Sequence, residues 1–271
     1  MKSMKLYVHV ERIYNELREL GVDEAAPLSV DMLTPFDQYH YLGTAAVEEA
    51  AKALDVTPAS RILEIGAGIG GPARYLAWLT GCRVVALELQ RDLNETAKFL
   101  TERCGLESQV THVEGDILAA PPGEGDFDGI MSFLVFLHIR NRSRLFDICH
   151  QALKPGHAMY IEDFVLKRAP TAIQRRDLEI KVMCPYLPDA AAYESELQQS
   201  GFTVERFEDQ TRAWSSFTAQ RLEAFRTARP RNVRVHGQAV TEGLEDFYAT
   251  VAGLYADGVL GGARIVARRP A

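Results

Sequence analysis

The stretch RILEIGAGIGGPARYLA, residues 61–77, decides how this chain folds. It begins with a short apolar run typical of a buried β-strand, and a helical pattern follows directly after the glycines. Glycine is needed between them because the chain must turn tightly and its backbone must approach a ligand closely. The spacing Gly66-x-Gly68-x-x-Gly71 also fits a dinucleotide-binding turn, and a glycine-rich turn without a ligand is a further alternative. The glycines alone therefore leave the ligand open.

Strand and helix patterns alternate from residue 60 onward. We expect strands at 61–65, 83–88, 110–114, 127–133 and 157–163, and helices near 70–80, 91–104, 142–153 and 189–200. Two further strands are expected at 202–207 and 259–267, with a helical insertion between them (about 211–257) beside the sheet's C-terminal edge. Such alternation predicts a parallel sheet with helices on both faces.

The N-terminal part has a different pattern. Apolar residues at helical spacing predict a short helix over 5–20, and a segment rich in proline and aromatic residues follows at 33–43. A second helix is expected over 44–55, with Thr44 as its N-cap. No linker divides the chain, so we expect one domain, 1–271. Within it, 1–43 is the candidate lid, 44–165 the cofactor-binding core, and 166–271 the substrate-side strands with the helical insertion.

Three carboxylates lie at the ends of three successive predicted strands. Glu64 precedes the first glycine, where it suits a ligand carrying an amino group and would repel a pyrophosphate. Glu88 ends the next strand, where an acid can accept hydrogen bonds from both ribose hydroxyls. Asp116 ends the third, where it can accept from an adenine amino group. Each acid alone is typical of a solvated turn, but all three at one sheet edge indicate a nucleoside ligand and disfavour an NAD-dependent oxidoreductase.

This pattern resembles the class I S-adenosylmethionine-dependent methyltransferases over residues 45–165. The resemblance implies an α/β fold: a doubly wound, seven-stranded, mostly parallel Rossmann-like sheet with an N-terminal helical lid and a helical insertion before the last strand. It also implies S-adenosylmethionine as the cofactor. The residues expected to contact the cofactor are Glu64, Gly66, Ala67 and Gly68 at the methionine end, Glu88 and Leu89 at the ribose, Asp116 and Ile117 at the adenine, and in addition Tyr41 and Phe133.

Residues 132–139, SFLVFLHI, are similar to the S-x-x-x-x-x-H-[IL] stretch of small-molecule amine methyltransferases, including the phosphoethanolamine, sarcosine and dimethylglycine enzymes. The resemblance implies that His138 is catalytic and supports proton removal from the amine, since histidine titrates near neutrality. The alternative is a histidine that satisfies a backbone carbonyl at a strand end. The chain departs from the phosphoethanolamine pattern at Leu134, where an aspartate is expected, and has no clear counterpart of the phosphate-binding arginine.

The acceptor pocket is predicted to be apolar, because the run 133–137 is apolar. Aromatic side chains in the flanking segments suit an acceptor that becomes cationic on methylation, although such rings are also typical of a core. The candidate substrate-binding residues are Tyr39, His40, Leu134, Phe164 and Tyr186.

Charge and composition exclude several classes of function. The net charge of −7 and the lack of a basic stripe argue against a nucleic-acid partner. Four cysteines without paired spacing argue against a metal site or a disulfide framework, and the polar N-terminus and short apolar runs argue against a signal peptide or a membrane span. We expect a cytoplasmic N-methyltransferase of a small amine or amino acid, whose oligomeric state the sequence does not indicate. The alternatives are a C-, O- or S-methyltransferase and a non-catalytic cofactor-binding regulatory module.

Overall fold

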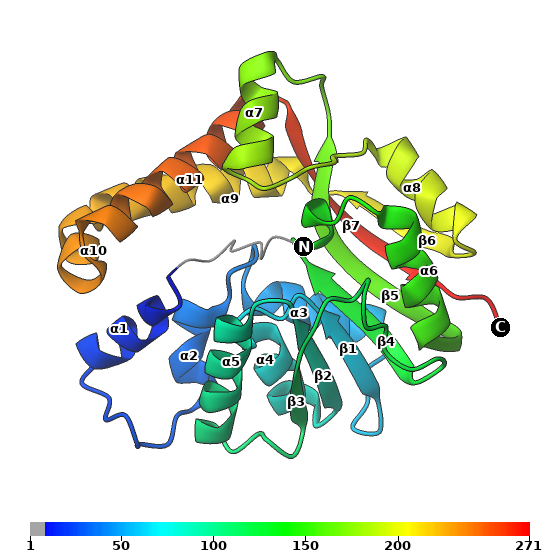
Figure 1. Cartoon of the computed structure of the whole chain (residues 1–271), viewed down its shortest axis with the longest axis horizontal. Coiled ribbons are helices and arrows are strands. Elements are labelled where there is room, and N and C mark those ends of the chain that lie inside the picture. The colour runs from blue at the N-terminus through cyan, green and yellow to red at the C-terminus, as the bar shows by residue number, and fades with distance from the viewer. Residues whose placement is uncertain (1–8) are drawn as a thin grey trace.

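A computed structural model describes residues 9–271 (Figure 1). Its sheet has seven strands in the order β3-β2-β1-β4-β5-β7-β6, and only β7 runs antiparallel to its neighbours. The strands are β1 (Arg61–Ile65), β2 (Arg83–Glu88), β3 (Val110–Glu114), β4 (Phe127–Phe133), β5 (Leu153–Leu166), β6 (Thr203–Asp209) and β7 (Leu260–Arg268). The predicted doubly wound fold is confirmed, and the first four strands have the predicted bounds.

Helices cover both faces of this sheet, and further helices lie beyond its carboxyl end (Figure 1). They are α1 (Glu11–Glu19), α2 (Val30–Asp37), α3 (Thr44–Ala53), α4 (Gly71–Thr80), α5 (Arg91–Arg103), the short 3₁₀ turn η1 (Phe136–His138), α6 (Arg142–Ala152), α7 (Ala172–Ile180), α8 (Ala190–Gln199), α9 (Thr211–Thr227), α10 (Arg229–His236) and α11 (Gln238–Ala256). Successive strand residues point to opposite faces, so Ile62 of β1 packs in the cluster with α3 and α4, whereas Leu63 packs in the cluster with α6 and α8.

Several bounds differ from the sequence prediction. Strand β5 is longer than 157–163 at both ends: Leu153 pairs with Phe127 of β4 at its start, and β7 pairs with it antiparallel from residue 158 to 166. Gly43, not Thr44, is the N-cap of α3 and has a φ of +57°. Helix α7 was not predicted, although Thr171 and Gln174 form a reciprocal capping box at its start. The first residues of the helix predicted at 5–20 lie outside the described part of the chain.

Helix α2 was also missed because it contains Pro35, which cannot donate to a carbonyl one turn earlier. Two side-chain hydrogen bonds stabilise the helix despite this proline. Ser29 caps the helix by accepting from the Met32 amide, and the Thr34 hydroxyl donates to the Asp31 carbonyl that Pro35 leaves open. Burial of Leu33 then holds the helix against the core.

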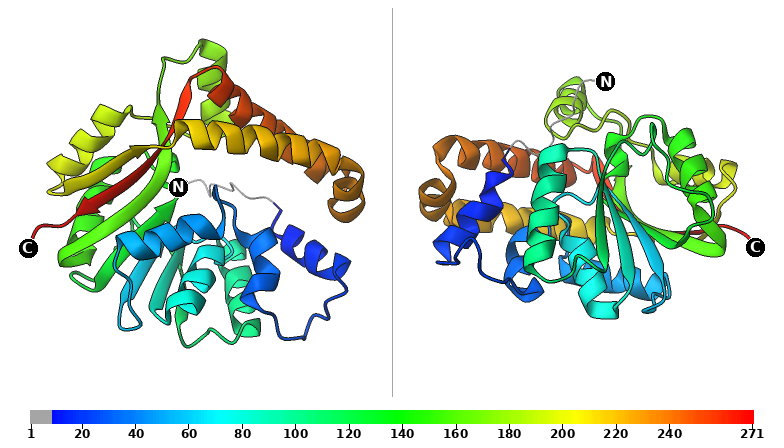
Figure 2. Two further views of the ribbon diagram at one scale, coloured as in Figure 1. Left: turned by 180° about the vertical axis from the view of Figure 1, so that it is seen from behind. Right: turned by 60° about the horizontal axis from the view of Figure 1, so that its bottom comes forward.

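The predicted helical insertion consists of α9, α10 and α11. Helices α9 and α11 pack against each other and extend across the carboxyl end of the sheet, with α10 at their far end, beside α1 (Figures 1 and 2). Trp214 anchors α9 on β7: it is fully buried, and any side chain at Gly262 would overlap its ring. No helix among residues 9–271 is long and apolar enough to cross a membrane.

Candidate active site

A cavity of about 1020 Å³ lies at the carboxyl ends of β1 to β4. Strands β1 and β4 are neighbours from which the chain winds outward in opposite directions, and open parallel sheets bind ligands at such a switch point. Most of the residues assigned from the sequence line this cavity: Tyr39, His40, Glu64, Gly66, Ala67, Gly68, Glu88, Leu89, Asp116, Ile117, Phe133, Leu134 and His138.

The glycine loop between β1 and α4 forms one wall of the cavity. Gly66, Gly68 and Gly70 have positive φ angles of 76°, 55° and 77°, which favour glycine. A side chain at Gly66 would overlap Val135, so this glycine lets the β4 loop approach closely. A side chain at Gly68 would meet no protein atom within 4 Å and would project into space that a ligand can use. The loop is thus shaped for close contact with a bound molecule.

Glu88 ends β2 and joins two loops at this wall. Its carboxylate accepts a hydrogen bond from the Gly68 amide at 2.8 Å and another from the Gln90 amide at 2.8 Å. Burial raises the pKa of Glu88, and these amide donors oppose that effect. Each carboxylate oxygen has a further lone pair, so the group can still accept hydrogen bonds from a ligand.

Glu64, on β1, is almost completely buried, with 2% of its surface exposed. Its Oε2 atom has no hydrogen-bond partner among the described residues, although it belongs to a residue that lines the cavity. Burial raises the pKa of Glu64 to about 8, despite the opposing charge of Arg74. A buried carboxyl oxygen without a partner at a cavity wall suits a ligand that brings its own hydrogen-bond donors.

The buried pair of Arg74 and Asp37 lies behind this carboxyl and was not anticipated from the sequence. Arg74 Nη2 donates to Asp37 Oδ2 at 3.0 Å, and both side chains are buried. The one available signal was an arginine in the otherwise apolar start of α4. The pair ties α2 to α4 and places Asp37 on the cavity lining.

The far wall is formed by the turn after β3. Asp116 accepts from the Leu118 amide at 2.9 Å, which fixes this turn, and the Gly115 amide donates to the Glu88 carbonyl at 2.9 Å. Ile117 is 5% exposed and packs in the main core cluster. The three predicted carboxylates therefore surround one cavity, from the ends of three adjacent strands.

The opposite end of the cavity is apolar and aromatic. The Phe133 ring lies 4.5 Å from the His40 ring, centroid to centroid. His40 Nε2 donates to the Gly43 carbonyl at 3.0 Å, and burial lowers the pKa of His40 to about 4. Leu134 has a φ of +56°, a strained conformation for leucine that is held where β4 ends at the cavity.

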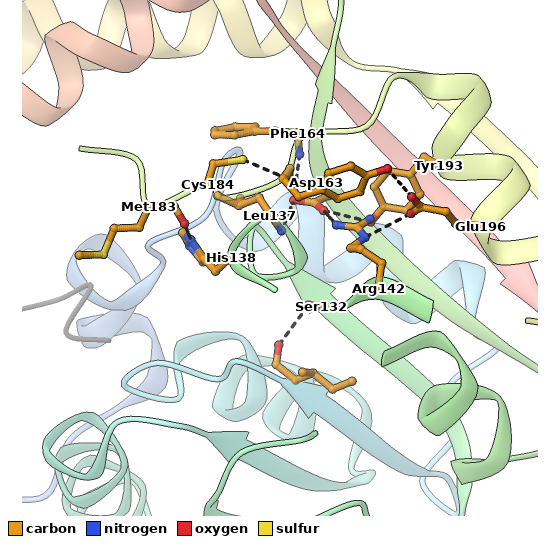
Figure 3. A network of polar contacts seen from close by, with 12 residues as sticks. Ser132, Leu137, His138, Arg142, Asp163, Phe164, Met183, Cys184, Tyr193 and Glu196 are labelled. Carbon is orange, nitrogen blue, oxygen red and sulfur yellow. Dashed lines mark hydrogen bonds and ion pairs between the residues drawn. The ribbon is translucent and has the colours of Figure 1, made fainter. Parts of the chain in front are cut away.

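His138 lies at the end of η1 and also lines the cavity. Its Nδ1 atom is 2.9 Å from the Met183 carbonyl (Figure 3). Burial lowers the pKa of His138 to about 4, and the Met183 hydrogen bond opposes this effect. The expectation that this ring titrates near neutrality is therefore wrong: burial keeps it uncharged at pH 7. The structure also contains the backbone-carbonyl contact of the alternative interpretation.

Three residues assigned from the sequence lie outside the cavity lining, which corrects their expected placement. Tyr41 and Phe164 belong to a buried aromatic cluster with Trp214, in which the Tyr41 ring is 5.1 Å from the Trp214 ring. Tyr186 donates its hydroxyl to Glu196 at 2.5 Å. The helical insertion places Trp214 against Tyr41 and Phe164, and α8 carries Glu196, the partner of Tyr186. The linear sequence did not reveal these contacts.

The candidate lid meets the helical insertion through ion pairs. Glu16 of α1 accepts from Arg231 of α10 at 3.1 and 2.6 Å and contacts His236 Nε2 at 2.8 Å. Glu19 pairs with Arg234 at 2.7 and 2.6 Å. We refer to these five residues as the α1–α10 seam. The apolar side of α1 packs with α2 and α5 in one core cluster, so the seam joins the insertion to a well-packed N-terminal segment.

Comparisons with other proteins agree with this geometry. Residues 62–156 match the family described as a methyltransferase domain. The glycine/sarcosine/dimethylglycine N-methyltransferase of Actinopolyspora halophila is 30% identical over 176 residues, which cover 65% of this chain and 31% of that protein. The sterol 24-C-methyltransferase of Eremothecium gossypii is 30% identical over 111 residues, 41% of this chain and 30% of that protein. The chain thus spans about a third of the length of these two relatives.

Among solved structures, the phosphoethanolamine N-methyltransferase 2 of Haemonchus contortus, in complex with phosphomonomethylethanolamine and S-adenosylhomocysteine, superposes with a TM-score of 0.79. The superposition covers 98% of this chain and 66% of that one at 18% identity, so it establishes the fold.

Proposed function

We propose that this chain, which carries a class I S-adenosylmethionine-dependent methyltransferase domain, transfers a methyl group from S-adenosylmethionine to a small-molecule acceptor, and that the acceptor atom is an amine or amino-acid nitrogen. The observation that carries this proposal is a single cavity lined both by three strand-end carboxylates and by the uncharged ring of His138.

The described residues fit this cofactor. Glu64 has an unpartnered buried oxygen for an ammonium group, and Gly68 leaves open space beside the backbone. Glu88 and Asp116 have carboxylate lone pairs available for ribose hydroxyls and for an amino group on the base. When bound, the cofactor supplies an electrophilic methyl group on a sulfonium centre. The protein's part is to bind, align and exclude water.

At the acceptor end, His138 acts in its uncharged form. Since Nδ1 donates to a carbonyl, the lone pair of the neutral ring is on Nε2. We propose that Nε2 accepts an N–H hydrogen bond from an uncharged amine and so turns the amine lone pair toward the methyl group. Phe133 and Leu134 exclude water from this contact. A protonated amine has no lone pair for this attack, so the acceptor must be uncharged when it binds. The N–H proton stays on the methylated product, which leaves as an ammonium.

A carbon or oxygen acceptor is the second candidate, because a specific feature favours it. The lining beyond the glycine loop is largely apolar, with Phe133, Leu134, Val135 and Ile139, and suits a hydrophobic substrate. The sterol methyltransferase among the relatives acts on carbon by its name. In this case His138 would accept a hydrogen bond from a hydroxyl or would only pack against the substrate.

We also propose that residues 1–271 work as one domain in which 1–43 closes the cavity as a lid. Support comes from the α1–α10 seam, which connects this segment to the insertion.

We also propose that the reaction takes place in the cytoplasm. The four cysteines are all free, as reduced thiols in the cytoplasm would be.

Product analysis tests the reaction. The protein is incubated with methyl-labelled S-adenosylmethionine and a panel of hydrophobic amines, amino acids, carboxylic acids, thiols, phenols and alkenes, and the labelled products are identified by mass spectrometry. We expect label on nitrogen. Label on carbon or oxygen would support the second candidate. Calorimetry in parallel should show binding of S-adenosylhomocysteine and none of NAD; the reverse would refute the proposed function.

A further inference from the structure

A buried charged network lies directly behind the turn that carries His138 (Figure 3). Asp163 is on β5, fully buried, and is not part of the cavity lining. Its Oδ2 atom accepts from Arg142 Nη1 at 3.2 Å and from the Tyr193 hydroxyl at 3.0 Å. Its Oδ1 atom accepts from two backbone amides, those of Leu137 at 3.2 Å and Phe164 at 2.9 Å.

The amide of Leu137 is the point at which this network reaches the site. Leu137 precedes His138 in η1, and Figure 3 shows Asp163 between Leu137 on one side and Arg142 with Tyr193 on the other. His138 is then held a second time, by the Met183 carbonyl at 2.9 Å. One contact fixes the backbone of the turn and the other fixes the ring, so together they set where the imidazole points.

The composition of the network favours a positioning role over a stabilising one. Arg142 is 3% exposed and lies over the Tyr193 ring, 4.1 Å from its centroid. Burying two charges removes their hydration, and well-packed apolar residues of similar size often serve stability as well or better. Apolar residues in these positions could not accept the hydrogen bond from the Leu137 amide, and so could not fix the backbone of the turn.

We infer that Asp163, held by Arg142 and Tyr193, is a positioning residue that fixes the 136–138 turn and thereby presents Nε2 of His138 to the acceptor. The inference rests on the proposed function, because the position of Nε2 affects turnover only if His138 contacts the acceptor. Asp163 itself touches neither substrate nor cofactor; it acts through the Leu137 amide.

The test compares Asp163→Asn with a matched control, Asp128→Asn. Asp128 is a carboxylate on β4 that accepts from Lys154 at 2.6 Å and from the Arg61 amide at 2.8 Å, outside the active-site cavity. The melting temperature of both variants is measured first. Turnover and S-adenosylhomocysteine affinity are then measured well below the lower of the two melting temperatures. We expect Asp163→Asn to reduce kcat by about 10- to 100-fold with cofactor affinity unchanged. Asp128→Asn should keep the parental kcat even if its melting temperature falls equally.

A second readout needs no turnover. The ¹⁵N shifts of the His138 ring in ligand-free protein report which nitrogen carries the proton. We expect one tautomer, Nδ1–H, in the parent and in Asp128→Asn, and a mixture in Asp163→Asn because the ring no longer faces Met183 in one orientation. Parental kcat and tautomer in Asp163→Asn would overturn the inference. If Asp163→Asn does not fold, Tyr193→Phe takes its place in the test, because it removes only one hydrogen-bond donor to Oδ2 of Asp163. We expect it to change kcat and the His138 tautomer ratio in the same direction as Asp163→Asn, but by less. No change in either would overturn the inference.

The two proposals fail in different ways. If His138→Ala keeps parental turnover while Asp163→Asn still shifts the tautomer, the role of His138 in the proposed function is refuted and the positioning of the ring stands. If His138→Ala reduces kcat while Asp163→Asn changes neither kcat nor the tautomer, the proposed function stands and the positioning role is refuted.

Discussion

His138 donates its Nδ1–H to the backbone carbonyl of Met183 across 2.9 Å. A carbonyl can only accept, so this contact selects the tautomer whose lone pair is on Nε2. Met183 has a φ of +55°, unusual for methionine, so its backbone conformation is strained beside the ring that it orients. The ring is thus prepared as an acceptor of hydrogen bonds before any ligand arrives.

The pKa of His138, lowered to about 4 by burial, leads to a prediction about the pH profile. The ring gains a proton only below about pH 4, so it stays neutral across the working range. His138→Ala should reduce kcat by about 10²-fold, the loss expected when the amine is no longer aligned with the methyl group, and by the same factor at every pH from 6 to 9. With an amine substrate, log kcat/KM should rise with pH up to the pKa of the amine itself in both proteins. Loss of an acidic limb near pH 6.5 in the variant would contradict this.

Glu64 gives a prediction about cofactor affinity. Its pKa is raised to about 8, so at pH 7 the carboxyl is mostly protonated in the free protein. An ammonium group favours the ionised form, so binding of S-adenosylhomocysteine should release a proton and tighten as the pH rises toward 8. Calorimetry at pH 7 in buffers of different ionisation enthalpy measures the release. Glu64→Gln should bind more weakly and release none, whereas equal release from parent and variant would show that another group titrates.

The glycine loop allows a matched pair of substitutions. Gly68 and Gly105 have φ angles of +55° and +67°, and a side chain at either would meet no protein atom within 4 Å. Backbone strain is therefore similar in the two valine variants, but only Gly68 lines the cavity. Gly68→Val should abolish binding of S-adenosylhomocysteine while Gly105→Val keeps it, with similar melting temperatures. Retained binding in Gly68→Val would remove this loop from the cofactor site.

The α1–α10 seam predicts a charge-reversal result. Glu16→Arg places two cations against each other at Arg231 and should separate α1 from α10, which lowers turnover because closure excludes water from the cavity. The double variant Glu16→Arg with Arg231→Glu restores opposite charges and should recover most of the loss. Steady-state kinetics and the melting temperature are measured for both. Parental turnover in the single variant would reduce the seam to a packing contact.

The sequence by itself determined the architecture and the cofactor end of the cavity. Short apolar strands separated by helical patterns have one favourable arrangement, and the bounds of β1 to β4 followed from local composition. Glu64, Glu88 and Asp116 converge because parallel strands end at one edge, so their positions along the chain implied their positions in space.

Only the tertiary structure decided the acceptor end. The uncharged state of His138 results from burial, and its tautomer is set by the carbonyl of Met183; both depend on segments distant in sequence. Contact between distant segments also explains why Tyr41 lies outside the cavity lining: Trp214 of the insertion packs against its ring. Strand periodicity is a local property that short stretches of residues carry, whereas burial, tautomer and charge pairing depend on which distant segments meet.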